Sequence, residues 1–430
     1  MNDETNREIA IPMLRFLGME SAQESERNAR LRDFLDAAER TGWESVVRCA
    51  RKAQLSPLLY HALRAVSPST KAPPQSALDA LRTDHLRSLC RNMRILHTVS
   101  EIVAECNAKN IPVILLKGAA LATAVYKDPG LRPMGDVDIL VGRQDIPEVH
   151  AILTRKGYRN LPDKDMMAAN HVPPCISPGK PTIEIHFTIL EEAQANSFNA
   201  GELFERAVPI TLSGVGAMTL APEDGLLHLC EHAGAHHVFE KGIRSMVDIS
   251  RLSEKYRDCF AWEAVWARAD EWGIRRSLAL CLSLCKKYIG FVIPSYIQDW
   301  LSKQENVEQN LEAAESILFA SDRRSVGSLA FAEFFSAKTL RAKARILFRV
   351  LSLPKETLLL IAECDQDKHK KKRTSLLSLY IRRASGLWKR HKRAALQALL
   401  KNSGRYNASQ PFAASSDAVL SLREWLKKNS

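Results

Sequence analysis

The chain has 430 residues, of which 46% are hydrophobic, and carries a formal net charge of +12. This length predicts two or three domains with a substantial core. The nine cysteines form no CxxC pair, which argues against a disulfide framework or a zinc ribbon. The first residues lack the basic and apolar regions of a signal peptide, and no apolar run approaches the roughly 20 residues of a membrane span. We therefore expect a soluble cytoplasmic protein with reduced thiols.

Residues 1–95 are predicted to form an N-terminal helical region. Apolar residues recur every three or four positions in the segments 31–40 and 78–89, with charged residues between them. Ser56-Pro57 is a typical start of a further helix. The region contains no group of residues typical of a catalytic or binding site, so it is interpreted as a structural support for the rest of the chain.

Two acidic residues stand at the start of a predicted strand, in the run Asp136-Val-Asp138-Ile-Leu-Val141. Because side chains alternate along a strand, Asp136 and Asp138 are expected on the same face. Neighbouring carboxylates repel each other unless a cation lies between them, and Mg²⁺ prefers oxygen ligands of this kind. A second alternating run, Thr182 to Phe187, places Glu184 and His186 on one face. These residues predict a metal site on a sheet.

The segments around these strands have a recognisable order. Residues 111–116 predict a strand that ends in a glycine turn at Lys117-Gly118, and residues 119–126 predict a helix. Residues 144–156 form an amphipathic helix that Gly157 ends. The polar, proline-rich connection 160–180 is a candidate cover for the site. From residue 203 onward the chain is interpreted as helical.

This order of elements resembles the DNA polymerase β-like nucleotidyltransferase superfamily. The motifs LLKGAAL, RPMGDVDILV, GY and IEIHF resemble a bacterial branch described as uncharacterised nucleotidyltransferases, and the likeness continues through residues 220–232 and 244–249. The resemblance implies an α+β fold in which a small mixed sheet has helices on one side. The implied domains are an N-terminal helical region (1–95), a catalytic core (96–200), a helical domain packed on it (201–300) and a C-terminal helical region (301–430).

The resemblance also implies a reaction, the metal-dependent transfer of NMP from an NTP to a hydroxyl group with release of pyrophosphate. Asp136 and Asp138 would hold Mg²⁺ or Mn²⁺, and Glu184 would be a third ligand or the general base. Candidate phosphate-binding residues come from the turn and from the loop before the acids; they are Lys117, Gly118, Arg132 and Gly135. The superfamily usually has a Gly-Ser or Gly-Gly turn, and this chain has no serine there. Lys117 can instead extend to solvent, and Arg132 can instead pair with Asp136 or Asp138.

A possible acceptor pocket comprises His186, His228, His232, Arg244 and Asp248. His186 is a candidate to bind the acceptor or the metal, and its alternative role is that of a residue hydrogen-bonded within the sheet. The histidines at 228, 232 and 236 follow one another at i,i+4 spacing, which permits a metal site, a polar seam or part of the pocket. Arg244 and Asp248 have the spacing of an intrahelical ion pair.

The positive charge is concentrated near the C-terminus. Between Lys368 and Ser416 the chain has 13 lysines and arginines and no carboxylate, so the remainder is close to neutral. Interspersed leucines give this basic tract, residues 368–405, an amphipathic helical character. It is expected to contact an anionic partner, with a lipid surface, RNA, and a peptide or triphosphate partner as alternatives.

Two other functions remain open at this point. The fold can serve as a decayed module that binds nucleic acid or protein, although three intact acids argue against decay. The chain can also be a phosphotransferase acting on a peptide or small molecule in a biosynthetic pathway. The acceptor itself is a small molecule, peptide, protein or RNA, because fold does not select among these.

Overall fold

Within the described residues, seven strands form one mixed sheet in the order β3-β4-β5-β2-β1-β7-β6 in the computed structural model. The structure describes residues 3–18, 23–65, 72–160, 171–190, 198–320, a few positions between 337 and 346, and 411–427. The strands are β1 (Ile114–Leu115), β2 (Asp136–Leu140), β3 (Arg159–Asn160), β4 (Cys175–Ile176), β5 (Thr182–His186), β6 (Val208–Leu212) and β7 (Val215–Thr219).

The predicted α+β fold with a mixed sheet is confirmed. Strand β2 pairs in parallel with β5 and antiparallel with β1. The strands predicted at Asp136 and Thr182 are present as β2 and β5, whereas the strand predicted over residues 111–116 is limited to the two residues of β1. The two strands that carry the candidate acids are therefore neighbours in the middle of the sheet.

The prediction that the chain is helical from residue 203 onward was wrong, because this part of the chain also contains two strands. Strands β6 and β7 form an antiparallel hairpin, and β7 joins β1 in parallel. The turn residues Ser213 and Gly214 both have positive φ, 48° and 84°, which is the geometry of a two-residue turn that suits twisted strands. The Ser-Gly pair between two alternating runs was the sequence signal for this hairpin.

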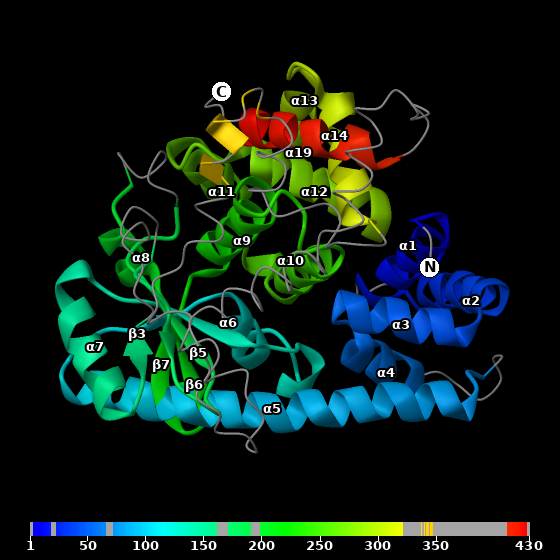
Figure 1. Ribbon diagram of the computed structural model, residues 1–430. Coiled ribbons are helices and arrows are strands. Elements are labelled where there is room, and N and C mark those ends of the chain that lie inside the picture. Colours follow the sequence, from blue (N-terminus) through cyan, green and yellow to red (C-terminus); the bar gives the residue numbers. More distant parts are fainter. Residues whose placement is uncertain are drawn as a thin grey trace.

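The two faces of the sheet have different partners. Val137, Ile139, Ile183 and Ile185 point to one face and are buried with apolar residues of helices α5 (Gln75–Ala108) and α7 (Ile146–Arg155). The opposite face carries the candidate acids and lies toward the C-terminal helices (Figure 1). The alternation of side chains along β2 and β5 thus separates a dry core from a polar site.

Helix α5 connects the N-terminal helices to the sheet. Its 34 residues span about 51 Å at 1.5 Å per residue, and it runs beneath both parts of the molecule (Figure 1). It crosses the expected domain boundary at residue 95 without interruption. The helices that pack on its first half are α3 (Trp43–Ala53) and α4 (Ser56–Arg64), and α1 (Asp3–Gly18) and α2 (Glu24–Thr41) pack on these two helices in turn.

A group of helices lies on the side of the polar face (Figure 1). Helices α9 (Pro222–Glu231) and α10 (Arg244–Lys255) face the sheet across the site, and behind them lie α8 (Gly201–Arg206), α11 (Trp262–Glu271), α12 (Arg275–Ile289), α13 (Ser295–Ser302), α14 (Val307–Leu318) and α19 (Pro411–Lys427). Helix α19 packs on α14. The basic tract 368–405 lies outside the described residues, so its anionic partner stays a prediction.

Two further expectations concern cysteines and membranes. The eight cysteines that the structure describes are all free thiols, and six of them are buried. None of the helices in the described ranges combines the length and the apolar character needed to cross a lipid bilayer.

The contact between α1 and α12 gives a stability prediction. A Cβ added at Gly18 would lie 2.4 Å from Ile289 Cγ2, and nothing lies within 4 Å of a Cβ added at Gly216. Overpacking in a core typically costs about 1–3 kcal/mol. We expect Gly18→Ala to lower the free energy of unfolding by this amount in a urea titration, and the matched Gly216→Ala to change it by less than about 0.5 kcal/mol. Equal effects of the two variants would contradict the close helix contact.

Candidate active site on the polar face of the sheet

Three carboxylates lie on the polar face because of the register between β2 and β5. The parallel pairing sets Asp136 opposite Thr182, Asp138 opposite Glu184, and Leu140 opposite His186. Asp136 is exposed at the start of its strand, whereas Asp138 is 6% exposed. The predicted gathering of Asp136, Asp138 and Glu184 on one sheet face is therefore present.

Asp138 is held by two side chains. The Lys117 ammonium lies 2.7 Å from its Oδ1 atom, and His186 Nε2 lies 2.9 Å from the same oxygen. Burial alone would raise the pKa of Asp138, but the Lys117 charge and the His186 hydrogen bond lower that pKa well below its ordinary value. Asp138 is therefore a carboxylate at neutral pH despite its burial.

The pKa values of Glu184 and His186 are also shifted, because both side chains are buried beside the Asp138 carboxylate. Burial and the negative charge of Asp138 raise the pKa of Glu184 to about 7. Burial lowers the pKa of His186 to about 4, although the hydrogen bond to Asp138 favours the charged form. A neutral His186 that contacts a carboxylate donates its Nε2 hydrogen. Ligand atoms of Asp138, Glu184 and His186 lie within 4.8 Å of one another, so the carboxylates have a spacing that one small cation can bridge.

Lys117 owes its position to an unusual backbone. It has a φ of 44°, in the left-handed region, and it is the first residue of α6 (Lys117–Ala124). The sequence placed this turn at a glycine, but the residue with positive φ is the lysine itself. Gly118 instead allows the close approach of Arg132, because a Cβ at this position would lie 2.9 Å from Arg132 Nη1. The turn thus directs the Lys117 side chain to Asp138 while α6 begins beside the site.

Arg132 forms its ion pair with a helix and not with the neighbouring acids. Its Nη2 donates to Asp248 Oδ2 on α10 at 2.8 Å, and Tyr126 donates to Asp248 Oδ1 at 2.8 Å. Both charged side chains are at most 10% exposed. Arg244 donates to Gln54 and to the Pro133 carbonyl. Arg132, Asp248 and Arg244 therefore join the loop before β2 to α10.

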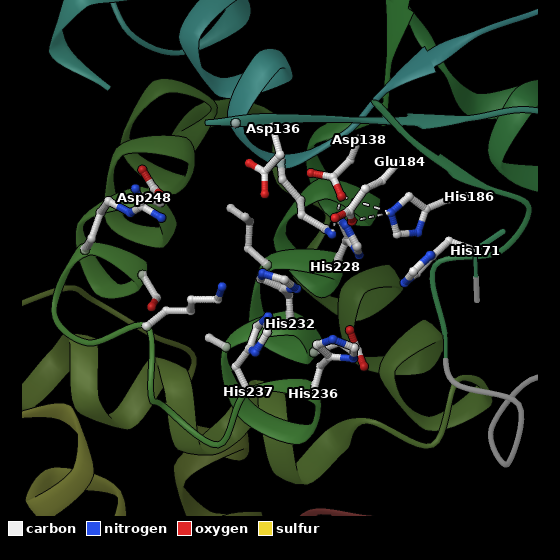
Figure 2. Close-up of a pocket in the computed structure, with 18 of the residues that line it drawn as sticks. Asp136, Asp138, His171, Glu184, His186, His228, His232, His236, His237 and Asp248 are labelled. Atoms are coloured by element: carbon white, nitrogen blue, oxygen red, sulfur yellow. Dashed lines mark hydrogen bonds and ion pairs between the residues drawn. The ribbon is translucent and has the colours of Figure 1, made fainter. Parts of the chain in front are cut away.

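A cavity of about 320 Å³ lies between the sheet and helices α9 and α10. The sheet side of its lining includes the three carboxylates and His186, together with Lys117 and Gly118. Figure 2 shows histidines on the other side, with His228 between the carboxylates and His232. Burial lowers the pKa of His228 and of His232 well below the ordinary value. The imidazoles of His228 and His232 are consequently neutral at physiological pH.

The structure adds several residues to the predicted site and shows that one predicted residue, Gly135, lies outside the cavity lining. His171, in the middle of the predicted covering segment 160–180, contacts the His186 ring at 5.1 Å between centroids and lines the cavity. His236, His237 and Lys241 line it too. The sequence signal for His236 and His237 was the histidine-rich run His232 to His237. Gly135 does not line the cavity, and a Cβ there would have only Arg91 nearby, at 3.9 Å.

The geometry fits what comparison with protein families shows. Residues 39–290, more than half of the chain, match the family described as uncharacterised nucleotidyltransferase. Searches of curated proteins and of solved structures returned no match. The matched region begins in α2, includes the seven strands of the described residues and the cavity, and ends after α12. The chain belongs to this nucleotidyltransferase family.

Proposed function

We propose that this protein is a divalent-metal-dependent nucleotidyltransferase that transfers NMP from an NTP to a hydroxyl group of an acceptor, with pyrophosphate as the second product. The observation that carries this proposal is the register of β2 with β5, which brings Asp136, Asp138 and Glu184 to one face at the floor of a cavity. Carboxylate oxygens are the ligands that Mg²⁺ and Mn²⁺ prefer.

The residues present fit such a cation. The raised pKa of Glu184, to about 7, arises from burial and from the charge of Asp138, and a cation among the carboxylates relieves this repulsion. Asp136, Asp138 and Glu184 would hold it. When bound, Mg²⁺ supplies positive charge that stabilises the attacking and leaving oxygens of an in-line displacement at the α-phosphorus.

The other groups position the reactants. The Lys117 ammonium is paired with Asp138, and Lys117 and Gly118, the first two residues of α6, both line the cavity. An ammonium group and a helix N-terminus both favour the negative charge of a triphosphate. In an alternative to holding the ion, Glu184 would accept the proton of the acceptor hydroxyl as a general base. His186 keeps Asp138 oriented.

A product analysis tests the reaction. Purified protein is incubated with Mg²⁺, a pool of candidate hydroxyl acceptors and an NTP that carries its label either at the α-phosphate or at the γ-phosphate. Nucleotidyl transfer predicts that the α-label enters the acceptor and that the γ-label leaves in pyrophosphate. Transfer of the γ-label to the acceptor, with release of nucleoside diphosphate, would instead identify a phosphotransferase and contradict the proposal.

Lys117 gives a prediction for nucleotide binding. A hydrogen bond with a charged group contributes about 1.5–3 kcal/mol, which corresponds to roughly 10–100-fold in affinity. We expect Lys117→Met to raise the Kd of an Mg²⁺–NTP complex by this factor in a calorimetric titration. The control is Lys255→Met at the exposed end of α10, which should leave the Kd unchanged. Unchanged NTP affinity in the Lys117 variant would remove this residue from the phosphate site.

A further inference from the structure

Three histidines gather on the cavity wall that faces the sheet carboxylates. Each of His232, His236 and His237 offers one ring nitrogen, and these three atoms lie within 4.8 Å of one another. The His237 ring centroid lies 4.3 Å from that of His232 and 4.5 Å from that of His236. Figure 2 shows the three side chains side by side, below the acids of the sheet. The cluster is thus a second group of ligand atoms in the same cavity.

A local change of helix type creates the cluster. Helix α9 ends at Glu231 and continues as a π-helical turn over His232–His236. The His237 amide donates to the His232 carbonyl at 3.2 Å, a bond across five residues. In a regular α-helix His236 would share a face with His232, and His237 would point elsewhere. The wider turn places His237 beside both, and such turns occur frequently at functional sites.

The backbone after the cluster is strained. Val238 and Phe239 both have positive φ, 45° and 61°, and both side chains are buried. This conformation is unfavourable for a residue other than glycine, and most of all for a β-branched one such as Val238. Strain of this kind persists where the surrounding structure holds it, and it is concentrated at functional sites. The packing of these two side chains therefore fixes the direction in which His237 points.

The donor type of the cluster differs from that of the sheet site. We propose that His232, His236 and His237 bind one divalent transition-metal ion of the zinc type, with a fourth coordination position open to the cavity. Imidazole nitrogens suit Zn²⁺, Co²⁺ and Ni²⁺, whereas carboxylates suit Mg²⁺ and Mn²⁺. Bonds of about 2.0–2.1 Å to a tetrahedral ion require nitrogens roughly 3.4 Å apart, which small side-chain rotations provide from the observed spacing.

A neighbouring histidine indicates that the open position is used. His228 is 2% exposed and lines the cavity, and neither of its ring nitrogens has a hydrogen-bond partner within the described part of the chain. Its ring centroid is 6.2 Å from that of His232. Buried polar groups are nearly always hydrogen-bonded, so these nitrogens point to a polar ligand in the cavity. Three protein ligands and one exchangeable position are the arrangement of catalytic zinc sites. The site goes beyond the proposed transfer reaction and does not depend on it.

Cobalt titration of the full-length protein tests the site. Metal-free protein is titrated with Co²⁺ in excess Mg²⁺, which competes with cobalt for the sheet carboxylates, and the visible absorption of cobalt is recorded. We expect one equivalent to bind with the intense absorption of a four-coordinate ion, and added Zn²⁺ to remove it. His232→Ala and His237→Ala should each weaken Co²⁺ binding by more than the about 10–100-fold seen for outer-shell changes. His61→Ala, an exposed histidine on α4, should leave binding unchanged.

The sheet site supplies the decisive comparison. Because His186 lies with Asp138 and Glu184, cobalt could bind there instead, so the Asp138→Asn/Glu184→Gln double variant is titrated in parallel. Full Co²⁺ affinity in that variant, even if it has lost all nucleotide transfer, supports the histidine site. Loss of Co²⁺ binding in that variant, retention in the two histidine variants, or no stoichiometric binding by the wild type would each overturn it. Circular dichroism shows that every variant compared is folded.

Discussion

Replacing Asp138 by asparagine is expected to reduce nucleotide transfer by at least about 10²–10³-fold, the loss seen when one preorganised charge-stabilising group is removed from an active site. The change keeps the shape of the side chain and removes its negative charge. Asp138 is the buried centre of the site, in contact with Lys117 and His186 and opposite Glu184 in the sheet. The loss should appear in the turnover rate at saturating NTP and Mg²⁺.

Two further variants separate chemistry from folding. Asp138→Asn leaves the Lys117 ammonium without its carboxylate, so some loss of stability is expected. The Lys117→Met/Asp138→Asn double variant removes both charges and should recover stability in a urea titration without recovering activity. Asp258→Asn, at an exposed acid of the 257–259 turn, should be as active as the wild type. Activity that recovered together with stability would show that Asp138 has a structural role only.

Replacing Arg132 by alanine is expected to lower the free energy of unfolding by about 3–5 kcal/mol, the typical effect of leaving one partner of a buried ion pair alone. The Asp248 carboxylate is 4% exposed and would keep only uncharged or more distant partners, such as the Tyr126 hydroxyl. The same pair connects the loop before β2 to α10, so the variant should also perturb Asp136 at the start of that strand. Urea unfolding measures the effect directly.

A paired replacement distinguishes lost charge compensation from lost packing. In Arg132→Met/Asp248→Leu no buried charge is left alone, and similar volumes remain, so most of the stability should return. The exposed pair of Arg40 with Glu8 provides the matched control, and Arg40→Ala should change stability by no more than about 1 kcal/mol. A small effect of Arg132→Ala, similar to that control, would show that the Arg132–Asp248 pair contributes little.

The sheet site was predictable because its pattern is local. Alternation in Asp136-Val-Asp138 and in Glu184-Ile-His186 fixes which side chains share a face, and the apolar residues between them fix which face is buried. Helices α2, α4 and α7 likewise follow from apolar spacing and from proline at a helix start. These features depend on residues close together in the sequence.

Other features depend on contacts between distant segments, which periodicity does not contain. The partner of Arg132 lies 116 residues away on α10, and neither Asp136 nor Asp138 takes that place. The hairpin of β6 and β7 is stabilised by joining β1, although Pro209 weakens its appearance as a strand. The π-turn at His232 and the left-handed φ of Lys117 are local strains that the surrounding packing maintains. Sequence rules describe unstrained backbone, so they miss both.

In the proposed reaction, the acids of β2 and β5 hold the metal at which a nucleotide is bound. The most direct measurement is a crystal structure of the protein with Mn²⁺ and an NTP analogue that cannot be cleaved, with the anomalous signal of manganese used to locate the ion. We predict an anomalous peak bounded by the carboxylates of Asp136, Asp138 and Glu184, with the triphosphate next to Lys117. An NTP analogue bound elsewhere, or bound at these strands with no manganese among the three carboxylates, would contradict the account.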